Sequence, residues 1–155
     1  MNIMLAYDDS RNSRYALERT LDMFGALKPT IVLIGVVEDS LDSSDANEEN
    51  YLQARQEFST AIRAAADRVG RRGLDAEAVI GEGDARKVIL KAVQSMHPDL
   101  LVIARRSDEP DGNLLAHSID ALVEEFNFMT FGSVSSFLAR RAPCPVLIQA
   151  CPAVL

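Results

Sequence analysis

Tryptophan is absent from this chain, cysteine occurs only twice, and lysine supplies only three of the 16 basic residues. Cys144 and Cys151 do not form a Cys-x-x-Cys pair, so the sequence indicates neither a metal ribbon nor a redox dithiol, and we expect free thiols in a reducing compartment. No basic run exceeds two residues, and the net charge is −7. This pattern excludes a nucleic-acid-binding stripe, because a net negative chain repels phosphate.

Long apolar runs are also missing. The longest spans Ile31–Val37, far short of the roughly 20 residues that a membrane-spanning helix needs. The first residues carry no basic segment and reach Asp8 and Asp9 early, which is unlike a signal peptide. We therefore expect a cytoplasmic protein that does not contact membranes.

Several catalytic and metal signatures are lacking too. There is no Gly-x4-Gly-Lys-Ser/Thr run, which excludes P-loop hydrolysis, and no Gly-x-Ser-x-Gly elbow. The two histidines, His97 and His117, stand in unrelated contexts, and His97 before Pro98 suits the end of a helix. Gly81–Arg86 half-resembles a dinucleotide fingerprint but fits better as a turn with Asp84 as a helix cap. We predict no catalytic residue and no metal ligand.

What the chain does contain is a regular alternation of apolar strands and amphipathic helices. A helix capped by Ser10 carries its apolar residues at Leu17, Leu21 and Phe24, and a longer one runs from about Tyr51 to Val69. Strands without polar alternation, separated by helices, indicate a parallel α/β sheet covered on both faces. At 155 residues we expect one domain, residues 1–155. The strands are expected at Ile3–Tyr7, Ile31–Val37, Ala76–Ile80, Leu100–Ile103 and Val146–Ile148.

Two segments depart from this plan. Glu38–Asn50 contains six acids and no base, and is expected to be a solvated connection between a strand and the long helix. The second segment, residues 108–131, is expected to be an insertion that contains an extra helix before the last one. Its apolar positions lie at helical spacing, which predicts a face that covers the sheet, a partner or the mouth of a site: Leu115, Ile119, Leu122 and Phe126.

The last third of the chain resembles the universal stress protein family. Its strand Leu100–Ile103 is followed by Gly132-Ser133 and then by Ala142-Pro-Cys-Pro-Val146, as in that family. ATP-binding members carry Gly-x2-Gly-x9-Gly-Ser/Thr here. In this chain Ala104 and Ser107 replace the first two glycines, and the spacer is 24 residues long. The resemblance implies an adenine nucleotide alpha-hydrolase-like sheet of order 3-2-1-4-5, with its ligand site beyond the carboxyl ends of strands one and four.

The family pattern implies a set of binding residues at that edge. Asp8 matches the acid that lies against adenosine, although the same carboxylate could cap the first helix instead. Gly132-Ser133 matches the phosphate-holding helix start, although Ser133 could equally be an ordinary helix cap. Arg105 and Arg106 are either substitutes for the missing backbone donors or an exposed basic pair. The full predicted set is Tyr7, Asp8, Val36, Ile103, Ala104, Gly132, Ser133, Val134 and Ser135.

Two functions follow from the resemblance. In the first, favoured because two of three glycines are replaced, the chain is a non-catalytic regulatory or stress-response module that needs no cofactor and binds ATP weakly or not at all. In the second it is a sensor of ATP or another adenine nucleotide, with the inserted helix as a lid. Slow ATP hydrolysis ranks third. The resemblance also implies a homodimer through the edge strand Cys144–Gln149, extended by Ala150–Leu155, and the inserted helix offers a second surface for a protein partner.

Overall fold

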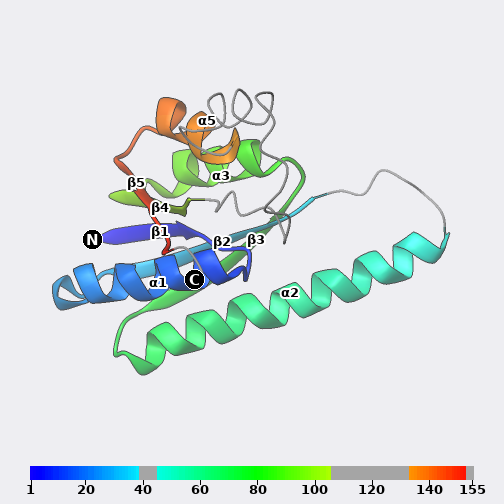
Figure 1. Ribbon diagram of the computed structural model, residues 1–155, viewed down its shortest axis with the longest axis horizontal. Helices are drawn as coiled ribbons and strands as arrows, with labels where there is room; N and C mark the ends of the chain where they lie inside the picture. Colours follow the sequence, from blue (N-terminus) through cyan, green and yellow to red (C-terminus); the bar gives the residue numbers. More distant parts are fainter. Residues whose placement is uncertain (39–44, 106–132, 153–155) are drawn as a thin grey trace, which may run out of the picture.

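The protein forms a five-stranded parallel sheet with the order β3-β2-β1-β4-β5 (Figure 1). The structure is a computed structural model that describes residues 1–38, 45–105 and 133–152, with the backbone alone over 45–47. The predicted α/β class, the parallel sheet and the strand order are confirmed. The strands are β1 (Asn2–Ala6), β2 (Thr30–Val37), β3 (Ala76–Glu82), β4 (Leu100–Ala104) and β5 (Val146–Gln149).

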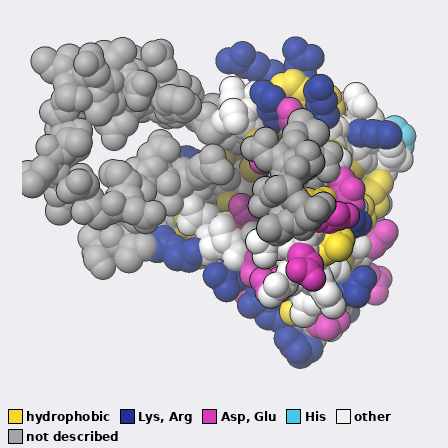
Figure 2. All heavy atoms as spheres, turned by 90° about the vertical axis from the view of Figure 1, so that its right-hand side faces the viewer, with side chains coloured by type: hydrophobic (Ala, Val, Ile, Leu, Met, Phe, Trp, Pro, Cys, Tyr) yellow, Lys and Arg dark blue, Asp and Glu magenta, His cyan; other side chains and the backbone are white. Residues whose placement is uncertain are grey.

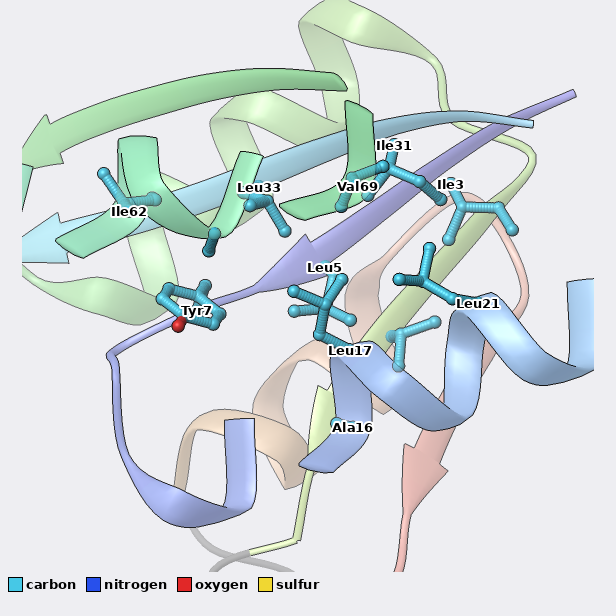
Figure 3. Packing of buried hydrophobic residues seen from close by; sticks show 12 residues of the cluster. Ile3, Leu5, Tyr7, Ala16, Leu17, Leu21, Ile31, Leu33, Ile62 and Val69 are labelled. Atoms are coloured by element: carbon cyan, nitrogen blue, oxygen red, sulfur yellow. The ribbon is translucent and has the colours of Figure 1, made fainter. Parts of the chain in front are cut away.

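Helices cover both faces of this sheet (Figure 1). One face packs against α1 (Arg11–Phe24) and α2 (Asp45–Arg71) through a buried cluster that includes Leu5, Leu17 and Ile62 (Figure 3). The opposite face packs against α3 (Ala85–Met96) and α5 (Ser133–Arg141). A short 3-10 turn, η1 (Gly25–Leu27), follows α1. Because β1 and β4 are central, both of their faces are buried, which explains why their sequences are apolar without alternation.

The ends of α1 and α3 lie where the sequence indicates. The Ser10 hydroxyl accepts a hydrogen bond from the Ser13 N–H, and the Asp84 carboxylate accepts one from the Arg86 N–H, as helix N-caps do. His97 ends α3 in a left-handed conformation, with φ of 47°, and its N–H donates to the Val93 carbonyl. Both predicted caps and the predicted helix end at His97 are confirmed.

One prediction about the acidic segment is wrong in part. Residues 45–50 were expected to belong to a connection, but they form the first turns of α2. The acids of this stretch explain the difference, because carboxylates such as Glu48 and Glu49 near a helix N-terminus are stabilised by the helix dipole. Residues 39–44 lie outside the described part of the chain.

The insertion at 108–131 and the helix expected within it also lie outside the described residues, as do Arg106, Ser107 and Gly132. Among the helices that the structure describes, none is long and apolar enough to cross a membrane. Both cysteines are free thiols that are half-buried.

Candidate functional site

The predicted site residues converge on the carboxyl-terminal edge of β1, β2 and β4. The register of β1 and β2 ends with Ala6 opposite Ile34, so Asp8 and Val36 each follow that pair by two residues. On the other side Leu5 lies opposite Val102, and two residues further come Tyr7 and Ala104. Neighbouring strands in a sheet lie roughly 5 Å apart, so the sheet brings the ends of these three strands together.

The same residues are divided between the two faces of the sheet. Tyr7 and Ala104 belong to the cluster under α1 and α2, and Figure 3 shows the Tyr7 ring at the end of β1 beside that cluster. Val36, Ile103 and Val134 belong to the cluster under α3 and α5. The strand residues in the predicted set therefore pack into the core beneath this edge. The polar groups at the edge come from the connections that follow the strands.

Asp8 is exposed, and its carboxylate turns back toward α1. Its Oδ1 accepts a hydrogen bond of 3.0 Å from the Ser10 N–H. Desolvation raises the pKa of Asp8, but hydrogen bonds from Ser10 and Ser13 outweigh it and hold the pKa below its usual value. The carboxylate is thus engaged with Ser10, the residue that caps α1, and is not the helix cap itself.

Tyr7 and Asp9 form the second polar contact of this connection. The Tyr7 hydroxyl donates to Asp9 Oδ1 over 3.0 Å, and the tyrosine is only 3% exposed. Burial, followed by the hydrogen bond and the negative charge of Asp9, raises the pKa of Tyr7 to about 12. Asp9 itself has a φ of 59°, in the left-handed region that non-glycine residues rarely adopt. The β1–α1 connection is therefore fixed by side chains on both sides of Asp8.

The end of β4 departs from a phosphate-wrapping loop. Ala104 is the last residue of β4 and pairs with Gln149 of β5. The strand hydrogen bonding continues one residue further, because the Arg105 N–H donates to the Gln149 carbonyl over 2.8 Å. Ala104, where the family resemblance leads one to expect a glycine, thus belongs to an extended strand, and the next backbone N–H already donates to Gln149.

The α5 helix starts at this edge with Ser133, as the sequence predicts. Ser133 is exposed, whereas Ser135 is only 4% exposed and Val134 packs into the cluster under α3 and α5. The two serines of the predicted cradle therefore differ in environment. Gly132 lies outside the described residues.

Sequence reasoning missed a group of contacts that completes the edge. The Asn12 side-chain amide donates to the Arg105 carbonyl over 3.1 Å, and the Cys151 thiol donates to the Asn12 carbonyl with 3.6 Å between the heavy atoms. The Arg11 guanidinium donates to the carbonyl of Pro152. These contacts join α1 to residues that follow β4 and β5. No local sequence pattern predicts contacts between residues so far apart in the chain.

Within the described ranges, no group of three or more histidine, cysteine or acidic side chains is arranged to hold a metal ion. What the edge offers is the Asp8 carboxylate, a buried phenol, the exposed Ser133 at a helix start and the Arg105 side chain. This set suits recognition of a polar ligand by hydrogen bonds.

Comparison with known proteins gives a consistent result. The sequence profile described as "universal stress protein family" matches residues 1–149. A universal stress protein family protein from Arabidopsis thaliana, solved with AMP bound, is 22% identical, with 99% of this chain and 93% of that chain covered and a TM-score of 0.69. The universal stress protein UspA from Lactobacillus plantarum is 19% identical, with 96% of each chain covered and a TM-score of 0.68.

A third structure, a universal stress protein in complex with cAMP, is 21% identical, with 96% of each chain covered and a TM-score of 0.63. The comparison with curated proteins gives no match.

Proposed function

Because the chain belongs to the universal stress protein family, we propose that it is a non-catalytic regulatory module of the stress-response type, whose sheet edge binds ATP weakly or not at all. The observation that carries this proposal is the extended conformation of Ala104 and the hydrogen bond that uses the Arg105 N–H. The family resemblance implies a phosphate-wrapping loop that begins here, whereas in this chain the strand pairing continues to Arg105.

The physical reason is the number of backbone donors that remain for phosphate. A polyphosphate is held by consecutive backbone N–H groups that converge on it, and glycine makes that curvature accessible. At the end of β4 the Arg105 N–H points to the Gln149 carbonyl, so this group is withdrawn from any ligand. Among the described residues at this edge, the start of α5 is the other backbone donor region, and one helix start holds fewer phosphate oxygens than a loop and a helix together.

The proposed lack of catalysis rests on the state of Asp8. A general base needs a pKa near the working pH, whereas hydrogen bonds from Ser10 and Ser13 lower the pKa of Asp8. A carboxylate with a lowered pKa is a weak base. Its contacts fit a structural or binding role at the start of α1.

We also propose a homodimer through the free edge of β5. Among the described strands β5 pairs with β4 alone, and its residues are half-buried in the single chain. The carbonyls of Pro145 and Gln149 accept hydrogen bonds from β4. Because alternate residues of a parallel strand bond to opposite sides, the backbone groups of Val146 and Ile148 are directed outward and suit pairing with a second copy.

A second function is favoured by the comparisons. Two of the similar structures contain AMP or cAMP, as their descriptions state. Tyr7, Asp8 and Val36 lie at the same edge, which supports recognition of an adenosine group even where the phosphate cradle is reduced. The alternative is therefore a sensor of an adenine nucleotide, in which the residues of the insertion close the site.

Calorimetric titration of the full chain with ATP, ADP, AMP and cAMP separates the two functions. The regulatory module predicts affinity for ATP no tighter than millimolar and no gain from the second and third phosphates. Micromolar ATP binding that is lost in Asp8→Ala and kept in Asp67→Ala, an exposed acid on α2, would establish the sensor instead.

Sedimentation equilibrium tests the dimer. Ile148→Pro removes an outward N–H and leaves the hydrogen bonds between β4 and β5 in place, as proline on an edge strand does. We expect a dimer in the parent protein and a folded monomer in the variant, with folding checked by circular dichroism. A monomeric parent protein at high concentration would contradict the dimer and leave the nucleotide question unaffected.

A further inference from the structure

The helices on one face of the sheet carry charge of a single sign. The sequences of α3 and α5 contain five basic residues and no acid, although the chain as a whole is acidic, with a net charge of −7. We call these residues the cationic face: Arg86, Lys87, Lys91, Arg140 and Arg141. All five are exposed.

The ion pairs of the described residues set this face apart from the opposite one. On the α1 and α2 side, Arg72 pairs with Glu18 and Asp22, and Arg55 pairs with Glu82. On the cationic face the only ion pair among described residues joins Arg86 to Asp84, the cap of α3. Among the described residues, no ion pair joins any of the other four cations to an acid.

An aromatic ring joins the two helices of this face. The Arg141 guanidinium lies 4.9 Å from the centroid of the Phe137 ring, and the Arg86 guanidinium lies 5.9 Å from it. Both distances are within the range of a cation–π interaction. Phe137 is itself packed against the buried cluster under α3 and α5. The ring therefore holds one arginine of each helix on the same surface.

The space-filling view agrees with this arrangement. Lys and Arg side chains lie at the upper end of Figure 2, at the level of α3 and α5 in Figure 1, and a second group lies at the lower end. On α3 the buried residues are Ile89 and Val93. Lys87 and Lys91 are one turn apart on the side of the helix opposite to these two residues, and so face solvent.

From these observations we infer that the cationic face binds an acidic peptide segment of a partner protein. Guanidinium groups form paired hydrogen bonds with carboxylates, and two of the three arginines are already oriented against an aromatic ring. Among the described residues, the ion pair between Arg86 and Asp84 is the one that such a peptide would compete with. The five residues of this face are neither among the predicted nucleotide-binding residues nor in β5, so the inference goes beyond the proposed function.

The size of the face favours a peptide over a nucleic acid. At 1.5 Å per residue the two helices are each roughly 14 to 18 Å long, a length that a peptide of about five extended residues covers. A duplex long enough for stable binding would extend past the face, and the net charge of −7 on the chain as a whole repels phosphate. A short run of glutamates or aspartates meets only the cations.

Fluorescence anisotropy of a labelled oligoglutamate peptide, titrated with the full chain at low salt, tests this inference. We expect saturable binding that weakens strongly at about 0.15 M salt, because exposed charges are screened. Lys87→Glu combined with Arg140→Glu should weaken binding by about tenfold or more. The matched control is Arg63→Glu combined with Arg71→Glu on α2, which changes the net charge by the same amount. We expect its peptide affinity to stay within about twofold of the parent protein, because only the net charge differs.

Three outcomes would overturn the inference. They are the absence of saturable peptide binding at low salt, an equal loss in the α2 control, and tighter binding of a labelled DNA duplex that responds to the same α3–α5 variants. Circular dichroism of both double variants shows whether each is folded. If Lys87→Glu with Arg140→Glu fails to fold, Lys87→Gln with Arg140→Gln provides the same comparison with a smaller expected loss.

Discussion

A hydrogen bond joins the side chains of Tyr7 and Asp9 in the connection between β1 and α1. The phenolic hydroxyl donates to Asp9 Oδ1 over 3.0 Å, and Asp9 accepts this bond from a left-handed backbone conformation, with φ of 59°. The pair lies on either side of Asp8, which is the acid that the family resemblance implicates in binding. This hydrogen bond is expected to affect the free energy of unfolding and the pKa of Tyr7.

Substitution of Asp9 separates the hydrogen bond from the backbone conformation. Asp9→Gly removes the hydrogen bond but suits the positive φ, so we expect a loss of about 1 kcal/mol in the free energy of unfolding. Asp9→Ala removes the same bond and adds the cost of a left-handed alanine, for a total of about 2 to 3 kcal/mol. Urea unfolding of the two variants measures the difference, and equal losses would show that the backbone conformation is not strained.

The raised pKa of Tyr7 predicts alkaline sensitivity. Its pKa rises from 10.0 to about 12, first through burial and then through the hydrogen bond to Asp9. Between these two values the unfolded chain loses the phenolic proton while the folded chain keeps it, so stability falls as pH rises. The fall should amount to about 3 kcal/mol relative to Tyr7→Phe, which has no such proton. Urea unfolding curves at several alkaline pH values measure this fall. An equal pH dependence of the free energy of unfolding in the parent protein and in Tyr7→Phe would contradict the prediction.

Ser10 is expected to stabilise the start of α1 through two contacts. Its hydroxyl caps the helix, and its N–H and hydroxyl hold Asp8. Ser10→Ala should cost about 1 kcal/mol of stability. Because folding lowers the pKa of Asp8, its ionised carboxylate stabilises the fold above the unfolded pKa, and this contribution is lost as pH falls. The free energy of unfolding of Ser10→Ala should therefore decline less steeply in acid than that of the parent protein.

The control for Ser10 is Ser95→Ala. Ser95 is exposed on α3, and its hydroxyl bonds only the carbonyl of Lys91 one turn earlier. Such a contact stabilises little in a helix, so this variant should be neutral or slightly more stable. If Ser95→Ala lost as much free energy of unfolding as Ser10→Ala, the loss at Ser10 could not be attributed to helix capping.

Gly35 allows α2 to pack closely against β2. A Cβ at this position would lie 2.5 Å from the Phe58 ring, closer than atoms can approach. Gly35→Ala should therefore cost about 1 to 3 kcal/mol, and Phe58→Leu in the same chain should recover part of that loss. The control is Gly70→Ala in α2, where nothing lies within 4 Å of the added carbon and a gain of about 0.5 to 1 kcal/mol is expected. Thermal or urea unfolding measures all three.

The strands and caps were predictable because their signals are local. An apolar run such as Ile31–Val37 predicts a buried strand, and β2 covers that run, beginning one residue earlier at Thr30. Ser10 and Asp84 have the side chains that cap helices, and both do so. The strand order came from the family resemblance, since periodicity alone does not specify which strands are neighbours.

The candidate site was only partly predictable. The residues expected at the edge do follow neighbouring strands, but the sequence did not tell whether Asp8 would face a ligand or the helix start. It gave no indication that Asn12 bonds the Arg105 carbonyl, because an amide side chain fits many partners and the two residues are far apart in the chain. The extent of α2 was misjudged because an acid-rich stretch can be either a solvated connection or the start of a helix.

The contacts of Arg11 and Asn12 also bear on how the chain is made. Arg11 bonds a residue 141 positions later, and the Asn12 carbonyl bonds one 139 positions later. While the ribosome is still synthesising the polypeptide, the amino-terminal half can form its first helix before residues 151 and 152, which these two contacts need, have been made. The β1–α1 edge therefore reaches its final arrangement only after residues 151 and 152 have left the exit tunnel.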